Sequence, residues 1–179
     1  MSLPSCDDIV TPHLTLIAIT PEMLKSEQTS DYQRLATRLQ ATVPTNWPPV
    51  DWEPHVLVFI LNQFQEHPEQ IGWHRYVILR HPDGGRTLIG ALGAFSKGVP
   101  PSECEIGYSI LPPFEGRGYA TEGTKALIAY LRADERINSI IAHTFPPLTG
   151  SIRVMEKCGL TFEGAGEEEG TIRYRLALR

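Results

Sequence analysis

The sequence predicts a mixed α/β fold in one domain that spans residues 1–179, with an ordered core over about 11–179. Segments with strand composition alternate along the chain with segments of helical spacing, which is typical of a sheet flanked by helices. One strand-like segment leads through a glycine-containing loop directly into a helix-forming run, within residues 104–126. The tail, residues 172–178, alternates apolar and charged side chains as a half-buried strand does. At 179 residues and 41% hydrophobic content, one sizeable core is expected.

The first quarter of the chain predicts a strand followed by helical structure. Residues 14–19 are mostly apolar and are expected to form the first strand. Thr20 and Pro21 then provide a helix N-cap and a proline at the first helical position. Residues 21–40 are helical in composition with an irregular middle, whereas residues 41–53 carry three prolines and are expected to be an irregular loop.

The middle of the chain predicts a helix and a hairpin. Apolar residues recur at helical spacing over 56–64, and Pro68 follows the end of this helix. Residues 73–80 and 87–95 have strand composition, and the turn-forming sequence HPDGG at 81–85 separates them.

The second half of the chain continues the alternation of strands and helices. We expect a strand at 103–111, a helix at 118–131, a strand at 137–144, a helix at 150–158 and a strand at 160–164. Gly159 is suited to the left-handed position that ends a helix.

The loop between residues 111 and 119 has the features of a phosphate-binding site. Gly116 and Gly118 allow an anion to approach the main chain, and Arg117 adds a charged donor. The N–H groups at the start of the following helix have no internal partner and favour anions. The nucleotide-binding patterns fit poorly. No Gly-Lys-Ser/Thr ends the loop, which argues against a P-loop, and Thr121 stands where the dinucleotide-binding pattern requires glycine.

Two motifs in this order carry a family resemblance. The segments EIGYSILPPFEGRGYATEG (residues 105–123) and SIRVMEKCGL (151–160), with a looser match at 11–16, resemble the GNAT superfamily of acyl-CoA-dependent N-acetyltransferases. The branch they are most similar to includes the ribosomal-protein N-terminal (alanine) acetyltransferases. The resemblance covers nearly the whole chain, and its pyrophosphate loop falls on residues 115–120.

The resemblance implies both a fold and an activity. The expected fold is a central, mostly antiparallel, twisted sheet that is splayed in the middle and flanked by helices. The expected activity is transfer of an acetyl group from acetyl-CoA, without a metal, to a primary amine by direct attack in a ternary complex. The amine would belong to a small molecule or to a protein N-terminus, and relatives often form homodimers.

The resemblance also assigns residues to the cofactor. The loop and the first helical turn would hold the pyrophosphate through Gly116, Arg117, Gly118, Tyr119, Ala120 and Thr121. Main-chain groups of Tyr108, Ser109, Ile110 and Leu111 would pair with the pantetheine arm, and one N–H would polarise the thioester carbonyl. Gly107 would permit a bulge that opens the sheet; the alternative is that it packs beneath a bulky neighbour.

Acetyl transfer needs a base, because an ammonium with a pKa of about 10.4 is almost fully protonated at neutral pH. Glu105 is the first candidate, since it shares a strand face with Gly107 and Ser109. The alternative is an exposed strand carboxylate paired with a basic neighbour. His143, at the end of a neighbouring strand, is the second candidate, although it could be an ordinary half-buried side chain. Glu122 is expected to support the helix N-terminus.

Three positions depart from the family pattern. Glu115 replaces Gln or Arg at the head of the loop, so its side chain is expected to point to solvent. Leu148 stands where the branch commonly has Asn, and Met155 stands where many relatives carry a proton-donating Tyr. The proton for the departing thiolate would therefore come from Ser151 or from water.

The acceptor pocket is expected between the early helices, the loop at 41–53 and the strand that bears Glu105. Trp47 and Trp52 could enclose an amine-bearing substrate, or they could fix the proline-rich loop to the core. Asp51 could receive a cationic acceptor or cap the helix that follows Pro54.

Composition limits the remaining classes of function. The net charge of −5, without a basic block, argues against nucleic-acid binding. The three cysteines lack metal-site spacing, and no apolar run reaches the ~20 residues that span a bilayer. We also expect no signal peptide, and therefore a soluble cytoplasmic protein. Two alternatives to the enzyme stay open: a non-catalytic acyl-CoA-binding module, and a nucleotide-phosphate binder of another family.

Overall fold

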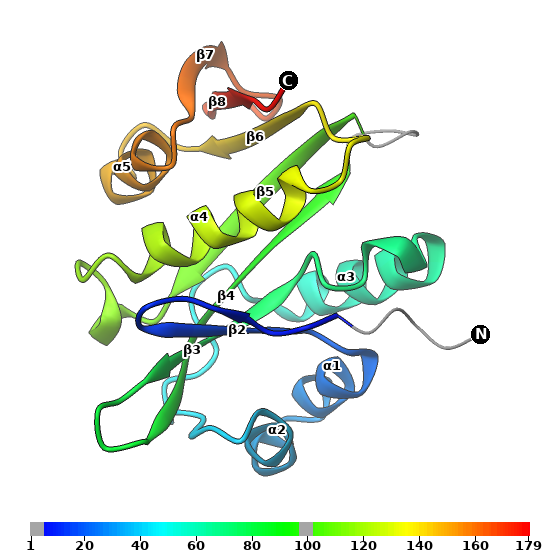
Figure 1. Cartoon of the computed structure of the whole chain (residues 1–179), viewed down its shortest axis with the longest axis vertical. Helices are drawn as coiled ribbons and strands as arrows, with labels where there is room; N and C mark the ends of the chain where they lie inside the picture. The colour runs from blue at the N-terminus through cyan, green and yellow to red at the C-terminus, as the bar shows by residue number, and fades with distance from the viewer. Residues whose placement is uncertain (1–5, 97–101) are drawn as a thin grey trace.

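The computed structural model describes residues 6–96 and 102–179, so two short parts of the predicted 1–179 domain lie outside the description. The described strands form one eight-stranded sheet in the order β1-β2-β3-β4-β5-β6-β8-β7 (Figure 1). All neighbouring strands are antiparallel except β5 and β6, which are parallel. The strands are β1 (Ile9–Val10), β2 (Leu14–Ala18), β3 (Arg75–Arg80), β4 (Arg86–Ser96), β5 (Glu103–Ile110), β6 (Ser139–Thr144), β7 (Thr161–Ala165) and β8 (Ile172–Ala177).

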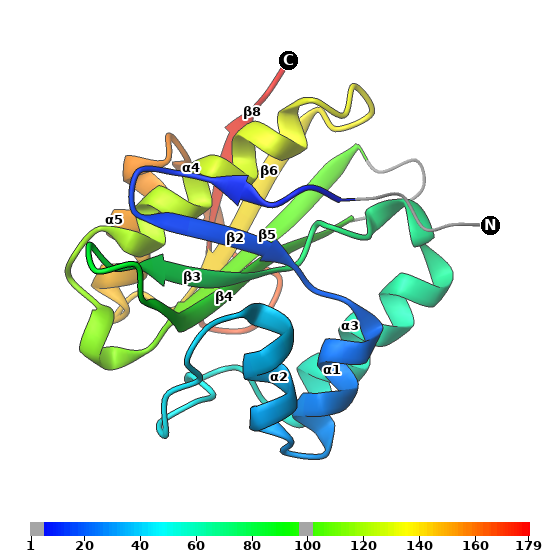
Figure 2. The same cartoon turned by 60° about the horizontal axis from the view of Figure 1, so that its bottom comes forward.

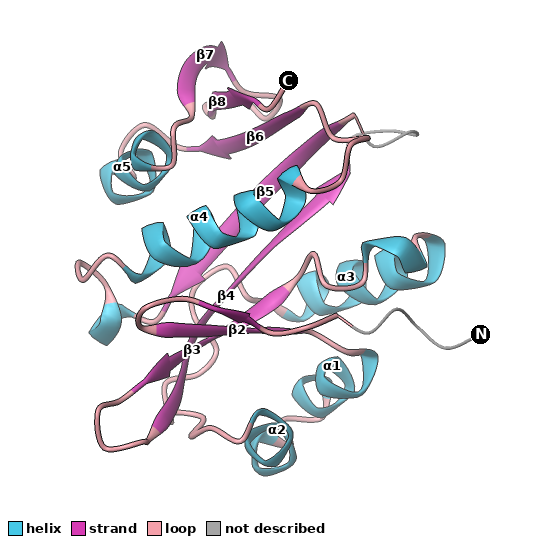
Figure 3. Ribbon diagram, viewed as in Figure 1, coloured by secondary structure: helices cyan, strands magenta, loops and turns pink. Residues whose placement is uncertain are grey.

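Helices cover both faces of this sheet (Figures 2 and 3). The α-helices are α1 (Pro21–Gln28), α2 (Tyr32–Leu39), α3 (Pro54–Glu66), α4 (Tyr119–Arg132) and α5 (Thr149–Lys157), with short 3₁₀ turns at Pro68–Gln70 and Pro112–Phe114.

Alternation along the strands produces two hydrophobic cores. On β3, Tyr76 and Ile78 belong to the core that packs against α1, α2 and α3, whereas Val77 and Leu79 belong to the core beneath α4 and α5. Successive side chains of a strand point to opposite faces, so a sheet covered on both sides is apolar on both. We refer below to the α1–α3 face and the α4–α5 face of the sheet.

The sheet divides between its two parallel strands. Only residues 103–105 of β5 pair with β6, opposite residues 139–141. β5 continues to Ile110 and β6 to Thr144, yet the described residues show no pairing between them beyond this short stretch. The splay expected from the family resemblance is therefore present.

Most of the predicted elements are confirmed within one to three residues. The Thr20 side chain accepts a hydrogen bond from the Met23 N–H at 3.3 Å and caps α1 as expected. Gly159, with φ +90°, ends α5 in the left-handed conformation that only glycine adopts without strain.

Two local expectations were wrong, and one strand was not predicted. The short strand β1 precedes the first expected strand, and residues 11–13 form the turn between β1 and β2. Asp51 does not cap α3: Glu53 holds the N-cap position without a side-chain bond, and Asp51 has φ +66°. Gly107 does not form a bulge: the β4–β5 ladder keeps its register through this residue. A register shift is found instead between β3 and β4, at Val77 and Ile78.

No helix among the described residues is long and apolar enough to cross a bilayer.

Candidate active site

The loop before α4 leaves open space above its glycines. Gly116 has φ +72° and Gly118 has φ +88°, and a Cβ built on either would meet no atom within 4 Å. Gly118 is the N-cap of α4 and makes no side-chain cap bond. The first turn of the helix is closed by the Glu122 N–H, which donates to the Gly118 carbonyl at 2.9 Å. The N–H groups of the three residues between them precede the helical ladder and are oriented to receive an anion.

The residues around this loop differ in their exposure. Glu115, Gly116, Arg117 and Gly118 are exposed, so the Glu115 carboxylate points to solvent as predicted. Tyr119, Ala120 and Thr121 are half-buried in the first turn of α4. Behind them Gly123 is buried, and a Cβ there would lie 2.8 Å from Leu92 Cδ2. A larger residue at 123 would push α4 away from the sheet.

Alternation along β5 decides which main-chain groups face the splay. In an antiparallel ladder a residue directs both its N–H and its C=O either to its partner strand or away from it. The Leu111 N–H donates to the Ile89 carbonyl at 2.8 Å, so odd-numbered residues of β5 face β4. Tyr108 and Ile110 consequently direct their main-chain groups toward the gap beside β6, whereas Ser109 and Leu111 do not. This narrows the predicted set of four pantetheine partners to two.

The two candidate bases form one hydrogen-bonded pair. His143 Nδ1 lies 2.9 Å from Glu105 Oε1, and the two side chains are 13% and 17% exposed. The other ring nitrogen, His143 Nε2, is buried and has no hydrogen-bond partner among the described residues. Because Glu105 is the last residue of β5 that pairs with β6, the carboxylate stands where the sheet opens.

Glu105 belongs to the α1–α3 face of the sheet. Gly107 is exposed with open space above it, so the alternative reading, in which it packs beneath a bulky neighbour, is also wrong. Ser109 Oγ donates to the Val50 carbonyl at 2.7 Å and so fixes the loop at 41–53 against β5. Phe95, directly opposite Glu105 on β4, packs edge to face on Phe59 of α3 with ring centroids 5.4 Å apart.

A second polar contact lies on the α4–α5 face, and sequence reasoning missed it. The Tyr108 hydroxyl donates to the Ser151 carbonyl at 2.9 Å and lies 3.2 Å from Ser151 Oγ. Ser151 is in the first turn of α5, whose N-cap Leu148 makes no side-chain cap bond. The sequence contains one signal of this contact: Tyr108 alternates with the buried Ile106 and Ile110, and a tyrosine on an apolar face needs a partner for its hydroxyl.

The two predicted substrate-binding tryptophans are core residues in this structure. Trp47 is 5% exposed and Trp52 is 8% exposed. Their indole N–H groups donate to Glu27 Oε2 at 2.9 and 3.0 Å, and the Tyr76 hydroxyl donates to Glu27 Oε1. These contacts match the alternative in which the tryptophans fix the proline-rich loop to the core.

Glu122 does more than support the start of α4. Its carboxylate accepts hydrogen bonds from Thr11 Oγ1 at 2.5 Å and from the His13 N–H at 2.8 Å, and so joins the β1–β2 turn to the helix. Burial alone would raise the pKa of Glu122, but the bonds from Thr11 and His13 outweigh it, and the net pKa lies below the usual value of 4.5.

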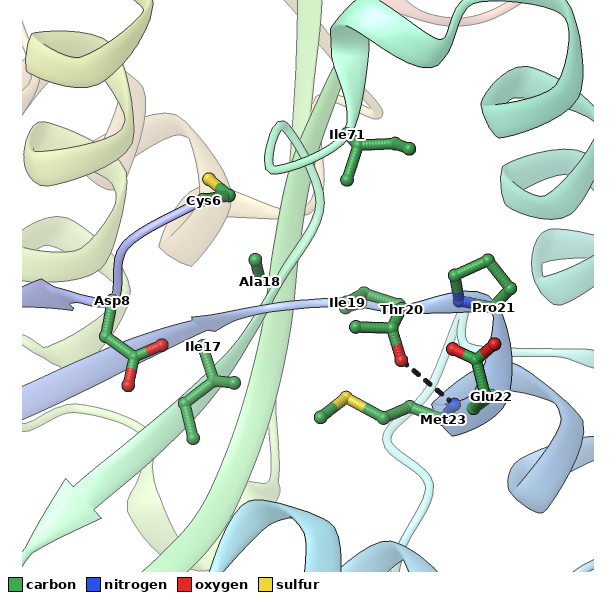
Figure 4. A pocket seen from close by; sticks show the side chains of 10 residues that line it. All are labelled: Cys6, Asp8, Ile17, Ala18, Ile19, Thr20, Pro21, Glu22, Met23 and Ile71. Carbon is green, nitrogen blue, oxygen red and sulfur yellow. Dashed lines mark hydrogen bonds between the residues drawn. The ribbon is translucent and has the colours of Figure 1, made fainter. Parts of the chain in front are cut away.

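A hollow of about 280 Å³ lies apart from these groups, beside the N-terminus of α1 (Figure 4). None of Glu105, Tyr108 and Gly118 lines it. Its lining residues are Cys6, Asp8, Ile17, Ala18, Ile19, Thr20, Pro21, Glu22, Met23 and Ile71.

Comparison with protein-family models identifies the class. Residues 23–161 match the model described as "Acetyltransferase (GNAT) domain", which is more than half of the chain. The chain therefore belongs to the GNAT acetyltransferase family, in agreement with the splayed sheet.

Individual relatives match parts of the chain. The uncharacterized N-acetyltransferase YnaD of Bacillus subtilis is 36% identical over 88 residues, which is 49% of each protein. The FsC-acetyl coenzyme A-N(2)-transacetylase of Aspergillus fumigatus is 32% identical over 82 residues, 40% of this chain and 35% of that protein. The match thus spans half or less of the length of these curated relatives.

Among solved structures, the fold is shared with RimL, a ribosomal L7/L12 alpha-N-protein acetyltransferase in complex with coenzyme A. The TM-score is 0.63 at 16% identity, and the alignment covers 96% of this chain and 98% of that one. The expected fold is confirmed by this agreement.

Proposed function

We propose that this protein transfers an acetyl group from acetyl-CoA to a primary amine by direct attack in a ternary complex. The observation that carries the proposal is the opening between β5 and β6. On one side of this opening lies the N-terminus of α4, which has no side-chain cap, and at its closed end lies the Glu105–His143 pair. Family membership supports acetyl transfer, and the RimL structure holds coenzyme A in the same fold.

The proposed cofactor site uses groups that the structure leaves accessible. The N–H groups of Tyr119, Ala120 and Thr121, with Gly116, Arg117 and Gly118, would hold the pyrophosphate. Positive φ angles and the open space above the two glycines fit a phosphate group, which a Cβ would exclude. Main-chain groups of Tyr108 and Ile110 would hold the pantetheine arm in the splay. Acetyl-CoA supplies the acetyl group as a thioester when it is bound.

The acceptor amine would approach from the α1–α3 face. Glu105 lies on this face and would take a proton from the ammonium group, while His143 Nδ1 fixes the orientation of the carboxylate. The exposed Val50 and the half-exposed Phe59 border the same face, so an amine with an apolar body or a peptide N-terminus fits this approach. The thiolate would leave toward the opposite face, where Ser151 or water would supply its proton.

The test is turnover of the variant Glu105→Gln. Free thiol released from acetyl-CoA is measured with a panel of amines and a peptide, and acetyl-CoA binding is measured by calorimetry. At neutral pH we expect kcat to fall by roughly 10²- to 10⁴-fold, the usual contribution of a general base. The loss should shrink at high pH, where amines lose their proton without help.

The matched control is Glu103→Gln, which removes a carboxylate from the same strand face. Glu103 binds Arg173 and Ser139 rather than His143, so turnover should change little. A Glu105→Gln pH profile that parallels the wild type would remove Glu105 from the role of base. Saturable binding of acetyl-CoA with no thiol release on any amine would instead favour the non-catalytic acyl-CoA-binding module.

A further inference from the structure

Tyr108 has a side chain and a main chain that reach the same opening. Its main-chain groups face the gap between β5 and β6, as the alternation of the β4–β5 ladder requires. Its hydroxyl is held at the first turn of α5, 2.9 Å from the Ser151 carbonyl and 3.2 Å from Ser151 Oγ. The hydroxyl therefore stands on the α4–α5 face of the opening, across the sheet from Glu105.

The proposed reaction needs a group on this face that stabilises the departing thiolate. When an amine attacks from the side of Glu105, the departing sulfur moves toward the opposite side. Met155 is 2% exposed, and a thioether has no proton to donate. The Ser151 hydroxyl is a weak acid and shares its contact with Tyr108. The Tyr108 hydroxyl, in contrast, is a phenolic donor that lies at this turn of α5.

The local electrostatics favour a donor there. Leu148 leaves the N-terminus of α5 without a side-chain cap, so the partial positive charge of the helix end is available to a thiolate. Burial raises the pKa of Tyr108 to about 12, although the hydrogen bond to Ser151 lowers it. The phenol thus keeps its proton across the physiological range, as a hydrogen-bond donor must.

We propose that the Tyr108 hydroxyl is a catalytic residue that donates a hydrogen bond to the departing coenzyme A thiolate. This proposal rests on the proposed function and adds a group to the same site. The carbon–sulfur bond breaks, and its electron pair moves to sulfur. The Tyr108 O–H bond stays intact. The hydroxyl turns its proton from the Ser151 carbonyl to the sulfur and stabilises the developing charge there, while the Ser151 hydroxyl donates to the phenol oxygen and holds it in place. The thiolate takes its proton from water, and Glu105 returns the amine's proton to water.

The test is the titration of the thiol of bound coenzyme A, which needs no acceptor amine. The thiolate is followed by its ultraviolet absorbance, and the complex with desulfo-coenzyme A is subtracted as the background. In the wild type the bound thiol should have a pKa below that of free coenzyme A. In Tyr108→Phe this pKa should rise by about one unit, a tenfold change in the ionisation constant, which is typical of losing one hydrogen bond to a charged group.

Two controls separate this role from a structural one. Tyr130→Phe removes a hydroxyl from α4 that contacts Cys6 instead, and it should leave the titration unchanged. Affinity for desulfo-coenzyme A should be the same in Tyr108→Phe and in the wild type, because the phenol acts on sulfur alone. If Tyr108→Phe does not fold, 3-fluorotyrosine incorporation must lower the pKa of the bound thiol further, since it is the stronger donor; an unchanged value would overturn the proposal.

The remaining outcomes are decisive. Identical titrations of wild type and Tyr108→Phe, with both binding coenzyme A, would overturn the role of Tyr108 and leave the proposed function standing. A rise seen only in Ser151→Ala would assign the donor to Ser151 instead. Wild-type protein that binds neither coenzyme A nor acetyl-CoA would refute the proposed function itself.

Discussion

Glu27 is a carboxylate buried among aromatic side chains. It is 6% exposed, and its carboxylate accepts hydrogen bonds from the indole N–H groups of Trp47 and Trp52 and from the hydroxyl of Tyr76. Burial raises the pKa of Glu27 above its usual value of 4.5, and the three hydrogen bonds offset only part of this effect. Glu27 therefore links α1 to the loop at 41–53, and its contribution to the free energy of unfolding depends on pH.

This arrangement predicts how stability changes with pH. The folded-state pKa of Glu27 exceeds the unfolded value, so between the two the folded protein binds more protons than the unfolded chain. The free energy of unfolding should fall as pH rises from about 4.5 through the higher folded-state pKa. Urea unfolding of the wild type and of Glu27→Gln over a pH series checks this.

The difference between the two proteins isolates the contribution of Glu27, because every other titrating group is common to both. We expect the difference in unfolding free energy to vary across that pH window and to be constant above it. A difference that is flat over the whole series would contradict a raised pKa for Glu27.

At the scale of elements, the glycine at the start of α4 can be compared with a glycine of the same conformation in the turn between β3 and β4. Gly118 and Gly84 have φ +88° and +86°, and open space surrounds the Cβ position of both. Gly84 lies in the turn between β3 and β4, so it shares the left-handed backbone conformation but not the proposed phosphate site. Substitutions at these two glycines therefore separate the loss of stability that a side chain causes from its effect on acetyl-CoA binding.

Gly118→Trp should abolish acetyl-CoA binding, whereas Gly84→Trp should leave it unchanged. Both variants should fold with a similar loss of roughly 1–2 kcal/mol from the left-handed backbone. Calorimetry with acetyl-CoA and thermal unfolding measure the two effects. Equal affinity in both variants would show that the cofactor does not use the N-terminus of α4.

Elements were predictable wherever a local signal exists. Thr20-Pro21 marked the start of α1 because a cap and a following proline act within one turn. The start of α3 was misread at Asp51, since its backbone has φ +66° and the sequence does not encode that angle. The two-residue strand β1 has no periodicity of its own, and it is a strand only because Ile9 and Val10 pair with β2.

At the scale of the whole molecule, the sheet separates the two halves of the proposed reaction. Glu105 and His143 lie on the α1–α3 face, and Tyr108 and Ser151 meet on the α4–α5 face. Long-range pairings of this kind were not predictable, because Glu105 meets His143 only through the parallel pairing of β5 with β6. The sequence offered Glu105 and His143 as alternative candidate bases, whereas in the fold they form one hydrogen-bonded pair.

Direct transfer also predicts that no acetyl-enzyme accumulates. Burial raises the pKa of Cys104 to about 12 and that of Cys158 to about 11, so neither is a ready nucleophile. Intact-protein mass spectrometry after incubation with acetyl-CoA alone should show an unmodified chain. A stoichiometric acetyl adduct that an amine then removes would indicate a two-step mechanism instead.

The division of the sheet has a consequence for how such a protein can diversify. If the proposed function holds, changes in α3 or in the proline-rich loop would reshape the proposed entrance for amines, while the proposed binding of acetyl-CoA at the start of α4 would stay the same. A different acceptor amine would then require changes only on the α1–α3 side of the sheet, and the residues proposed to bind acetyl-CoA could stay unchanged.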